Sequence, residues 1–355
     1  MTSRQEQNTG TIEVREAHRF DVRLLEDYMS SHVESFRAPL KIREFKGGQS
    51  NPTYLLEGES DEYVLRRKPP GKLLKSAHAV DREYRIISAL YAAGFPVPRP
   101  YVLCKDDAVI GTMFYIMEFV RGRIFWNLGI PESTPEERSA IYDSLNETIA
   151  SLHCLDFAAM GLTDFGKPGN YFARQISRWS RQYRASQTST ILDMDALIEW
   201  LPDNIPDDES ASIVHGDFRL DNLVIHPTEP RVIAVLDWEL STIGHPLADF
   251  TYHLMAWQMP EFGTGSTGLL GKDLESLGIP DEDSYARRYC ERSGRAGGID
   301  NRNFYSAFNF FRLAAILQGI AGRVRDGTAA SAHAANAVNS VVPLARLGWQ
   351  YANRG

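Results

Sequence analysis

Hydrophobic positions in the first third of the chain change from a helical to a strand-like spacing. Residues 20–33 carry a helical pattern, and Asp21 is placed to cap its N-terminus. From residue 40 to 120, short apolar runs alternate with Gly, Pro and Asp, which is typical of strands joined by turns. One helical pattern interrupts them at 76–94 and ends on a glycine. We predict a small antiparallel sheet with one main helix.

The chain after Gly122 is predominantly helical in pattern. Thr134-Pro135-Glu136-Glu137 reads as a capping box with proline at the first helical position. A short β-rich segment at 213–239 separates the earlier helical patterns from those that run to about residue 351. The predicted fold is α+β with two lobes. We divide the chain into a polar leader that we expect to be disordered, a nucleotide-binding lobe and a helical lobe that carries the catalytic loop and acceptor pocket: 1–15, 16–120 and 121–355.

The β-rich segment contains polar residues at positions that core packing does not explain. Asp217 and Asn222 are five residues apart in "HGDFRLDN", and Asp237 ends the apolar run "VIAVLD". Two short strands joined at "HPTEP" would form a hairpin that brings Asn222 and Asp237 to one edge. Any one of these residues alone is more often a cap or turn residue. Together they match the phosphoryl-transfer pattern, with Asp217 as the base and Asn222 and Asp237 as Mg²⁺ ligands.

The same pattern requires phosphate- and adenine-binding parts upstream. In "YVLRRK", strand alternation puts Val64, Arg66 and Lys68 on one face. Val64 would meet adenine and Arg66 would take the place of the usual lysine, although Lys68 remains an alternative. Glu83 follows in the helical pattern and would pair with the cation. The remaining candidates are a glycine-containing turn and a strand end whose backbone would meet adenine: Gly47, Gly48, Ser50 and Asn51, then Glu118, Phe119 and Val120.

These motifs resemble those of the aminoglycoside phosphotransferase and choline-kinase-like family, which has a protein-kinase-like fold. "HGDFRLDN", "VLDWE" and "GHPLADF" carry the resemblance, which covers roughly residues 40–350. The resemblance implies ATP, Mg²⁺ and phosphorylation of a hydroxyl group. It also makes Asp249 a structural partner beneath the site, although Asp249 could equally be a helix N-cap. His215 reads as structural support for the loop.

More narrowly, "GGQSNPTYLL" and "RQISRWSRQY" look like the branch related to phosphotransferase domains fused to acyl-CoA dehydrogenases. That branch suggests a hydroxy acid or hydroxyacyl-CoA as acceptor. A basic helix face with Arg174 and Arg178 would suit such an anion, although a solvated helix face explains it as well. Alternatives are an aminoglycoside, choline, sugar or fructosamine kinase, and a nucleotide-binding pseudoenzyme.

Composition narrows the class of protein without changing this interpretation. The chain has 355 residues, with 38 Lys and Arg against 46 Asp and Glu, a net charge of −8. An acidic balance disfavours a general nucleic-acid binder. Three scattered cysteines without a C-x-x-C pair fit a reducing compartment. No apolar run approaches the ~18 residues of a membrane span, and the start lacks a signal-peptide pattern. We expect a cytoplasmic enzyme with a small-molecule partner and neither nucleic acid nor membrane; the sequence does not indicate the oligomeric state.

Overall fold

A computed structural model describes residue 5 and residues 9–46, 51–69, 79–260, 268–325 and 339–354. The chain divides into two units, and each is described by itself below. The first unit comprises Met1–Thr148 and Arg219–Ser241, and the second comprises Ile149–Phe218 and Thr242–Gly355. The division into functional lobes at residue 120 stays a prediction.

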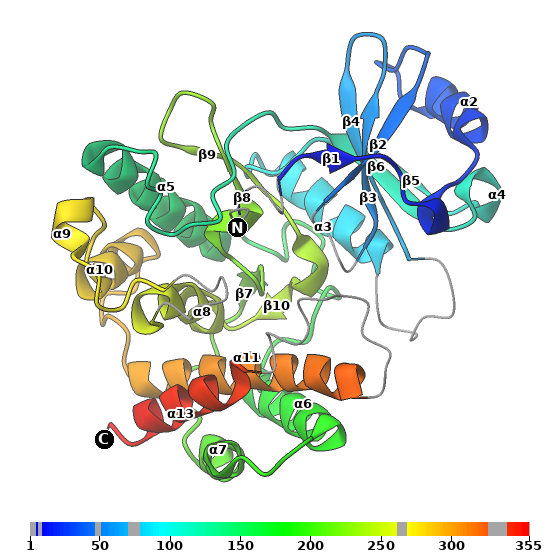
Figure 1. Ribbon diagram of the computed structural model, residues 1–355. Helices are drawn as coiled ribbons and strands as arrows, with labels where there is room; N and C mark the ends of the chain where they lie inside the picture. The colour runs from blue at the N-terminus through cyan, green and yellow to red at the C-terminus, as the bar shows by residue number, and fades with distance from the viewer. Residues whose placement is uncertain are drawn as a thin grey trace. The chain divides into compact units, whose positions relative to one another are not determined.

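A six-stranded antiparallel sheet organises the first unit, in the order β1-β2-β3-β4-β6-β5 (Figure 1). The predicted α+β fold is therefore confirmed for this part of the chain. The strands are β1 (Thr11–Ile12), β2 (Lys41–Phe45), β3 (Thr53–Glu57), β4 (Glu62–Arg67), β5 (Pro100–Cys104) and β6 (Phe114–Glu118). The associated helices are η1 (Glu16–His18), α2 (Val22–His32), α3 (Val80–Ala92), α4 (Asp107–Ile110) and the first part of α5 (Pro135–Cys154).

Strand alternation gives this sheet two different faces. Tyr63 and Leu65 of β4 pack with Leu25 and Met29 of α2 in one apolar cluster. The intervening β4 residues face the other way, where α3 lies along the sheet. Asp21 caps α2 as predicted, because its carboxylate accepts a 2.9 Å hydrogen bond from the Arg23 N–H. The α2 cluster thus fixes the sheet and leaves the α3 face available for polar side chains.

A short hairpin completes the first unit and confirms the predicted pairing. β8 (Leu223–Ile225) runs antiparallel to β9 (Val232–Val235), with Leu223 opposite Val235. The 3₁₀ turn η2 (Leu220–Asn222) precedes the hairpin and η3 (Trp238–Leu240) follows it. The Trp238 indole packs edge-on against Phe95 at 6.0 Å and donates a 3.0 Å hydrogen bond to the Val235 carbonyl. This anchor fixes the segment that begins at Asp237.

The second unit consists mainly of helices. Its long helix α11 packs against α6, α8 and α13. The strands β7 and β10 form an antiparallel pair, and the loop that contains Asp217 follows β7. The helices are α6 (Tyr171–Ser186), α7 (Leu192–Asp203), α8 (Pro246–Gln258), α9 (Leu274–Leu277), α10 (Glu282–Arg292), α11 (Arg302–Arg325) and α13 (Val341–Ala352); the strands are β7 (Ser212–Val214) and β10 (Thr242–Gly244).

His253 of α8 makes the stability of the second unit sensitive to acid. Burial lowers the pKa of His253 to about 4, and its Nε2 lies 2.9 Å from the Tyr285 hydroxyl. The unfolded chain takes up this proton near pH 6.5 and the folded chain only near pH 4, so stability falls as pH drops between those values. At pH 4.5 we expect His253 to account for roughly 2–3 kcal/mol of the lost unfolding free energy. Denaturant titrations of the wild type and His253→Gln at pH 7.0 and 4.5 check this, and an equal pH dependence in both would contradict it.

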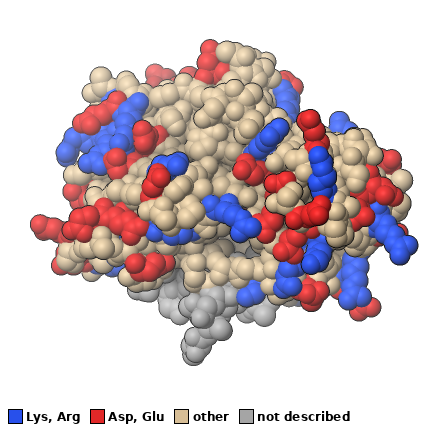
Figure 2. All heavy atoms as spheres, turned by 90° about the horizontal axis from the view of Figure 1, so that it is seen from above, with Lys and Arg blue, Asp and Glu red and all other residues tan. Residues whose placement is uncertain are grey.

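Charged side chains of both signs are mixed on the face shown in Figure 2, with basic and acidic groups close together.

Within the described parts of the chain, no helix combines the length and the apolar character that crossing a membrane requires.

Candidate active site

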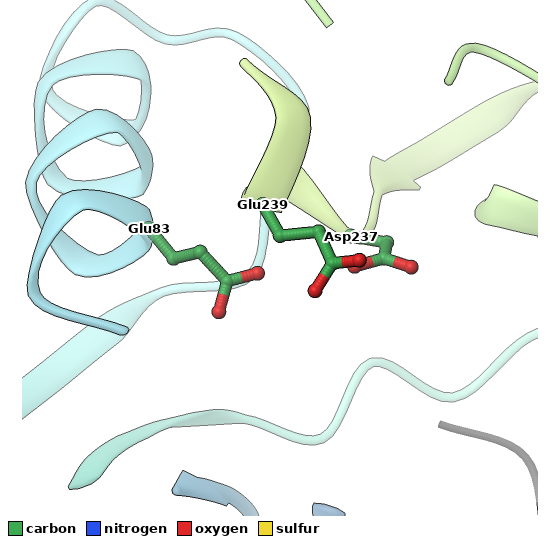
Figure 3. A group of neighbouring side chains, drawn as sticks. All are labelled: Glu83, Asp237 and Glu239. Atoms are coloured by element: carbon green, nitrogen blue, oxygen red, sulfur yellow. The ribbon is translucent and has the colours of Figure 1, made fainter. Parts of the chain in front are cut away.

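Arg66 of β4 is the centre of an ion-pair group in the first unit. Its Nε lies 3.1 Å from Glu83 of α3, and its Nη2 lies 2.6 Å from Asp237 and 3.4 Å from Glu239. Figure 3 shows the three carboxylates, which reach the same place from α3 and from the segment at η3. Asn51 lies beside them and donates a 3.3 Å hydrogen bond to Glu239. Residues up to 188 positions apart in the sequence therefore meet at one point.

The group brings one guanidinium together with three acidic side chains. Arg66 is 8% exposed and Glu83 1% exposed, and one guanidinium faces three acidic side chains. The pKa of Glu83 is raised to about 8, chiefly by burial and also by Asp237 and Glu239, against the lowering effect of Arg66. The carboxylates hold the pKa of Arg66 well above its usual value, outweighing the effect of burial. Hard carboxylate and amide oxygens such as these are the ligands that Mg²⁺ accepts, and the three carboxylates lie close enough together to hold a metal ion.

The hairpin brings the two predicted metal ligands next to each other along the backbone. The Leu236 N–H donates a 2.8 Å hydrogen bond to the Asn222 carbonyl, so Asn222 lies beside the residue that precedes Asp237. Asp237 has a left-handed backbone, with φ 66° and ψ 64°. This conformation costs about 1 kcal/mol for most side chains, and Asp is among those that adopt it most readily. A strained acidic residue where a strand ends is typical of a functional position.

The predicted adenine-binding residues lie on β4 and at the end of β6. Register places Val64 opposite Met117, on the sheet face that carries Arg66. The N–H groups of Glu118 and Phe119 donate to the carbonyls of Arg99 and Glu62 at 2.8 and 3.4 Å. Among the described residues, none hydrogen-bonds the Val120 N–H, which is the group that we expect to meet adenine.

The structure places Lys68 differently from Arg66. Lys68 follows the end of β4, where its N–H donates to the Met113 carbonyl at 3.2 Å, and it makes no ion pair within the described part of the chain. Arg66, not Lys68, therefore meets Glu83. The candidates Gly47, Gly48 and Ser50 lie outside the described residues.

Asp217 lies in a tightly bonded loop of the second unit. Its Oδ1 accepts a 2.7 Å hydrogen bond from the Tyr252 hydroxyl, and its N–H donates to His215 Nδ1 at 3.1 Å. Gly216 has φ +85°, a conformation that a side chain would strain. Arg312 of α11 donates a 2.7 Å hydrogen bond to the Gly216 carbonyl and stacks its guanidinium over the Tyr252 ring at 5.2 Å. The carboxylate is held by its neighbours before any ligand binds.

Asp249 supports this loop from beneath. Its two oxygens accept the N–H groups of His215 and Gly216 at 2.6 and 2.8 Å, and His153 Nε2 lies 3.4 Å away. Burial raises the pKa of Asp249, but His153 and the backbone donors outweigh it, so the pKa is lowered. Asp249 does not cap α8, because His245 occupies the N-cap position and accepts the Leu247 N–H. His215 also supports the loop, because its Nδ1 accepts the hydrogen bond from the Asp217 N–H.

The two arginines predicted to bind the acceptor have other partners in the structure. Arg174 donates to the backbone carbonyls of Gly169 and Lys167. Arg178 is exposed and stacks over Trp179 at 5.1 Å. Their role in acceptor binding stays a prediction.

Three residues of this site escaped the sequence interpretation. Glu239 could have been found, because it is the last residue of the quoted motif "DWE". No sequence pattern distinguishes Tyr252 from the other residues of its buried helix. A weak signal marks Arg312, since it is the only charged residue between 303 and 322.

Replacing Tyr252 with Phe should test its effect on Asp217. Phenylalanine keeps the ring under Arg312 and removes only the hydrogen bond to the carboxylate. Because a hydrogen bond to a charged group contributes about 1.5–3 kcal/mol, we expect kcat to fall about 10- to 100-fold while the acceptor KM changes little. Steady-state kinetics measure both. An unchanged kcat would mean that the hydrogen bond does not matter for turnover.

Comparison with known proteins decides the family to which this site belongs. The sequence model of the phosphotransferase enzyme family matches residues 41–305, which include Asp217, Asn222 and Asp237. The chain belongs to this family. It is therefore a phosphotransferase-family protein with a protein-kinase-like fold, as the motifs predict.

Curated relatives of this phosphotransferase are larger proteins. It is 45% identical over 353 residues to acyl-CoA dehydrogenase family member 11 of Rattus norvegicus, covering 97% of this chain and 45% of the relative. It is 46% identical over 316 residues to family member 10 of Mus musculus, covering 89% of this chain and 30% of the relative. The chain thus spans less than half the length of these relatives.

Solved structures resemble this phosphotransferase along most of its length. A protein of Ralstonia eutropha JMP134, provisionally named an aminoglycoside phosphotransferase, is 52% identical with a TM-score of 0.86, covering 95% of this chain and 99% of that one. Aminoglycoside phosphotransferase APH(4)-Ia, solved with AMP-PNP and hygromycin B, is 15% identical with a TM-score of 0.58, covering 91% and 98%. The second likeness establishes the fold alone.

Proposed function

We propose that this phosphotransferase is an ATP- and Mg²⁺-dependent kinase that phosphorylates a hydroxyl group of a small anionic acceptor. The observation that carries the proposal is the group of Arg66 with Glu83 and Asp237. In the phosphoryl-transfer pattern, a strand cation, a helical Glu and a metal-binding Asp occupy these relative positions. The nucleotide complex of APH(4)-Ia supports ATP as the donor.

The residues of the first unit would hold the nucleotide. Val64 and the backbone at Glu118–Val120 would meet adenine, and Arg66 would meet the phosphates. Asn222 and Asp237 would hold Mg²⁺, because amide and carboxylate oxygens are ligands that this ion accepts, and Asp237 belongs to a group of carboxylates that could hold a metal. Bound there, Mg²⁺ would neutralise charge that develops on the transferred phosphate. Glu83 keeps Arg66 oriented and, with Mg²⁺ present, is expected to ionise.

Asp217 would act on the acceptor. Tyr252 holds the carboxylate through Oδ1, and the carboxylate would orient the acceptor hydroxyl and accept its proton. The γ-phosphoryl group passes to the acceptor oxygen as the bond to the ADP leaving oxygen breaks. The hydrogen bonds from Gly216 and His215 to Asp249 keep the loop in position for this step.

The acceptor class is supported by the relatives. Two of them are named acyl-CoA dehydrogenase family members, which favours a hydroxy acid or hydroxyacyl-CoA. The name of the Ralstonia protein favours an aminoglycoside as the second candidate. Coupled ADP-release assays over hydroxy acids, hydroxyacyl-CoA thioesters and aminoglycosides separate these. Turnover confined to aminoglycosides would reject the anionic acceptor, and ATP binding without turnover of any acceptor would favour a pseudoenzyme.

A further inference from the structure

Arg312 is a buried charge whose role the proposed reaction does not explain. Its side chain lies on α11 and the residue is 6% exposed. The guanidinium donates one hydrogen bond, to the Gly216 carbonyl at 2.7 Å, and stacks over Tyr252. None of the ion pairs among the described residues includes Arg312. Because buried charges are normally paired, the missing counter-ion is a specific feature of this position.

Arg67 of β4 shows what a purely structural arginine looks like in this chain. It is 3% exposed, donates to the His18 carbonyl at 3.0 Å and stacks over Phe20 and Tyr54. Its Nε is fully buried without a hydrogen-bond partner, so no ligand can reach that donor. Arg312 has no such enclosed nitrogen, although most of its five donors are unused. Those donors keep contact with solvent and can receive a ligand.

The free donors lie close to the catalytic loop. The Gly216 carbonyl that binds Arg312 belongs to the residue joined directly to Asp217, and consecutive Cα atoms are about 3.8 Å apart. A small molecule with its hydroxyl at Asp217 can therefore present another group to Arg312. Guanidinium donors bind planar anionic oxygens in pairs, and partial burial strengthens that interaction.

We infer that Arg312 binds an anionic oxygen group of the acceptor and thereby selects acceptors that carry negative charge. The inference rests on the proposed phosphorylation of an acceptor hydroxyl. Two sources share this chemistry: a free carboxylate a few bonds from the hydroxyl, and a phosphate of a CoA thioester. A polycationic acceptor would meet an unpaired positive charge beside the base and is disfavoured.

The test compares charged and uncharged acceptors of the same shape. Wild type, Arg312→Gln and Arg312→Lys are assayed with 2-, 3- and 4-hydroxybutanoate, with the corresponding hydroxybutanamides and with the CoA thioesters. We expect Arg312→Gln to lower kcat/KM for the preferred charged acceptor by about 30-fold or more, and for the matching amide by less than about 3-fold. Arg312→Lys should recover part of the loss. Dependence confined to the free acid identifies a carboxylate, and dependence confined to the thioester identifies a CoA phosphate.

Loss of loop support gives a different result. If Arg312 only holds Gly216 and Tyr252, the charged acceptor and its amide lose kcat/KM by the same factor, which overturns the inference. The inference is also overturned if the wild type is equally active on the charged acceptor and on its amide. Thermal melting and nucleotide affinity of each variant separate misfolding from either result.

Calorimetry distinguishes failure of the inference from failure of the proposed reaction. The hydroxybutanoates and thioesters are titrated into Asp217→Asn and into Asp217→Asn with Arg312→Gln, which requires no turnover. Weaker binding of the charged ligand to the double variant supports anion recognition even if no acceptor is phosphorylated. The inference is overturned if the charged ligand binds equally to both variants or binds to neither. In that case the kinase proposal still stands if the wild type turns over uncharged acceptors.

Discussion

Asp217→Asn should abolish most phosphoryl transfer and leave the nucleotide bound. The amide oxygen of asparagine can still accept the Tyr252 hydrogen bond, so the loop keeps its shape. Asparagine cannot accept the acceptor proton, and loss of a general base typically costs about 10²–10⁴-fold. We therefore expect kcat to fall about 1,000-fold, with Mg·ATP affinity within about threefold of wild type.

A nearby acidic residue provides the control for this variant. Asp221 pairs with Arg219 at 3.0 Å and has no assigned role in proton transfer. Asp221→Asn should keep turnover within about an order of magnitude of wild type. Product formation measured in single-turnover experiments, together with calorimetric titration of Mg·ATP, checks both variants. Full turnover by Asp217→Asn would remove Asp217 from the role of base.

Arg66→Gln should affect both stability and nucleotide binding. The substitution leaves Glu83, Asp237 and Glu239 together without their guanidinium partner. Breaking a buried ion pair from one side typically costs 3–5 kcal/mol, and proton uptake by Glu83 would relieve part of it, so we expect a loss of about 3 kcal/mol. Loss of charge-assisted bonds to phosphate should weaken ATP binding about 10–100-fold. Denaturant unfolding and calorimetry measure the two effects.

Arg67→Gln is the matched control, because it removes a buried arginine from the adjacent position of the same strand. Arg67 faces the α2 cluster side and binds the His18 carbonyl rather than a carboxylate. We expect it to lower the free energy of unfolding while leaving ATP affinity nearly unchanged. Equal losses of affinity in both variants would show that Arg66 acts through stability alone.

Local pattern explains why much of the fold could be predicted. The hairpin follows from two apolar runs around "HPTEP", and the cap of α2 follows from Asp21. The pairing of Arg66 with Glu83 could be predicted because strand alternation determines the sheet face on which an arginine side chain lies. These features depend on residues close together in sequence or on one familiar motif order.

Long-range pairing explains what the sequence did not reveal. Tyr252 meets Asp217 across 35 positions and Arg312 meets Gly216 across 96, and no periodicity encodes either contact. Arg174 bonds carbonyls just before its own helix, contacts that its charge did not predict, and its role in acceptor binding stays a prediction. Charge alone cannot distinguish a ligand-binding arginine from one that satisfies backbone groups.

The hairpin register has a consequence for recognising related proteins. Leu223 pairs with Val235 and the Leu236 N–H bonds the Asn222 carbonyl, so strand pairing brings Asn222 beside the residue before Asp237, whatever the number of residues in the turn at 226–231. Lengthening a surface turn costs little free energy, whereas one residue added within either strand reverses every side chain beyond it. Homologues should therefore keep the interval from Asp217 to Asn222 fixed and let the interval from Asn222 to Asp237 vary. A sequence search that allows a variable second gap would recover family members that a rigid pattern misses.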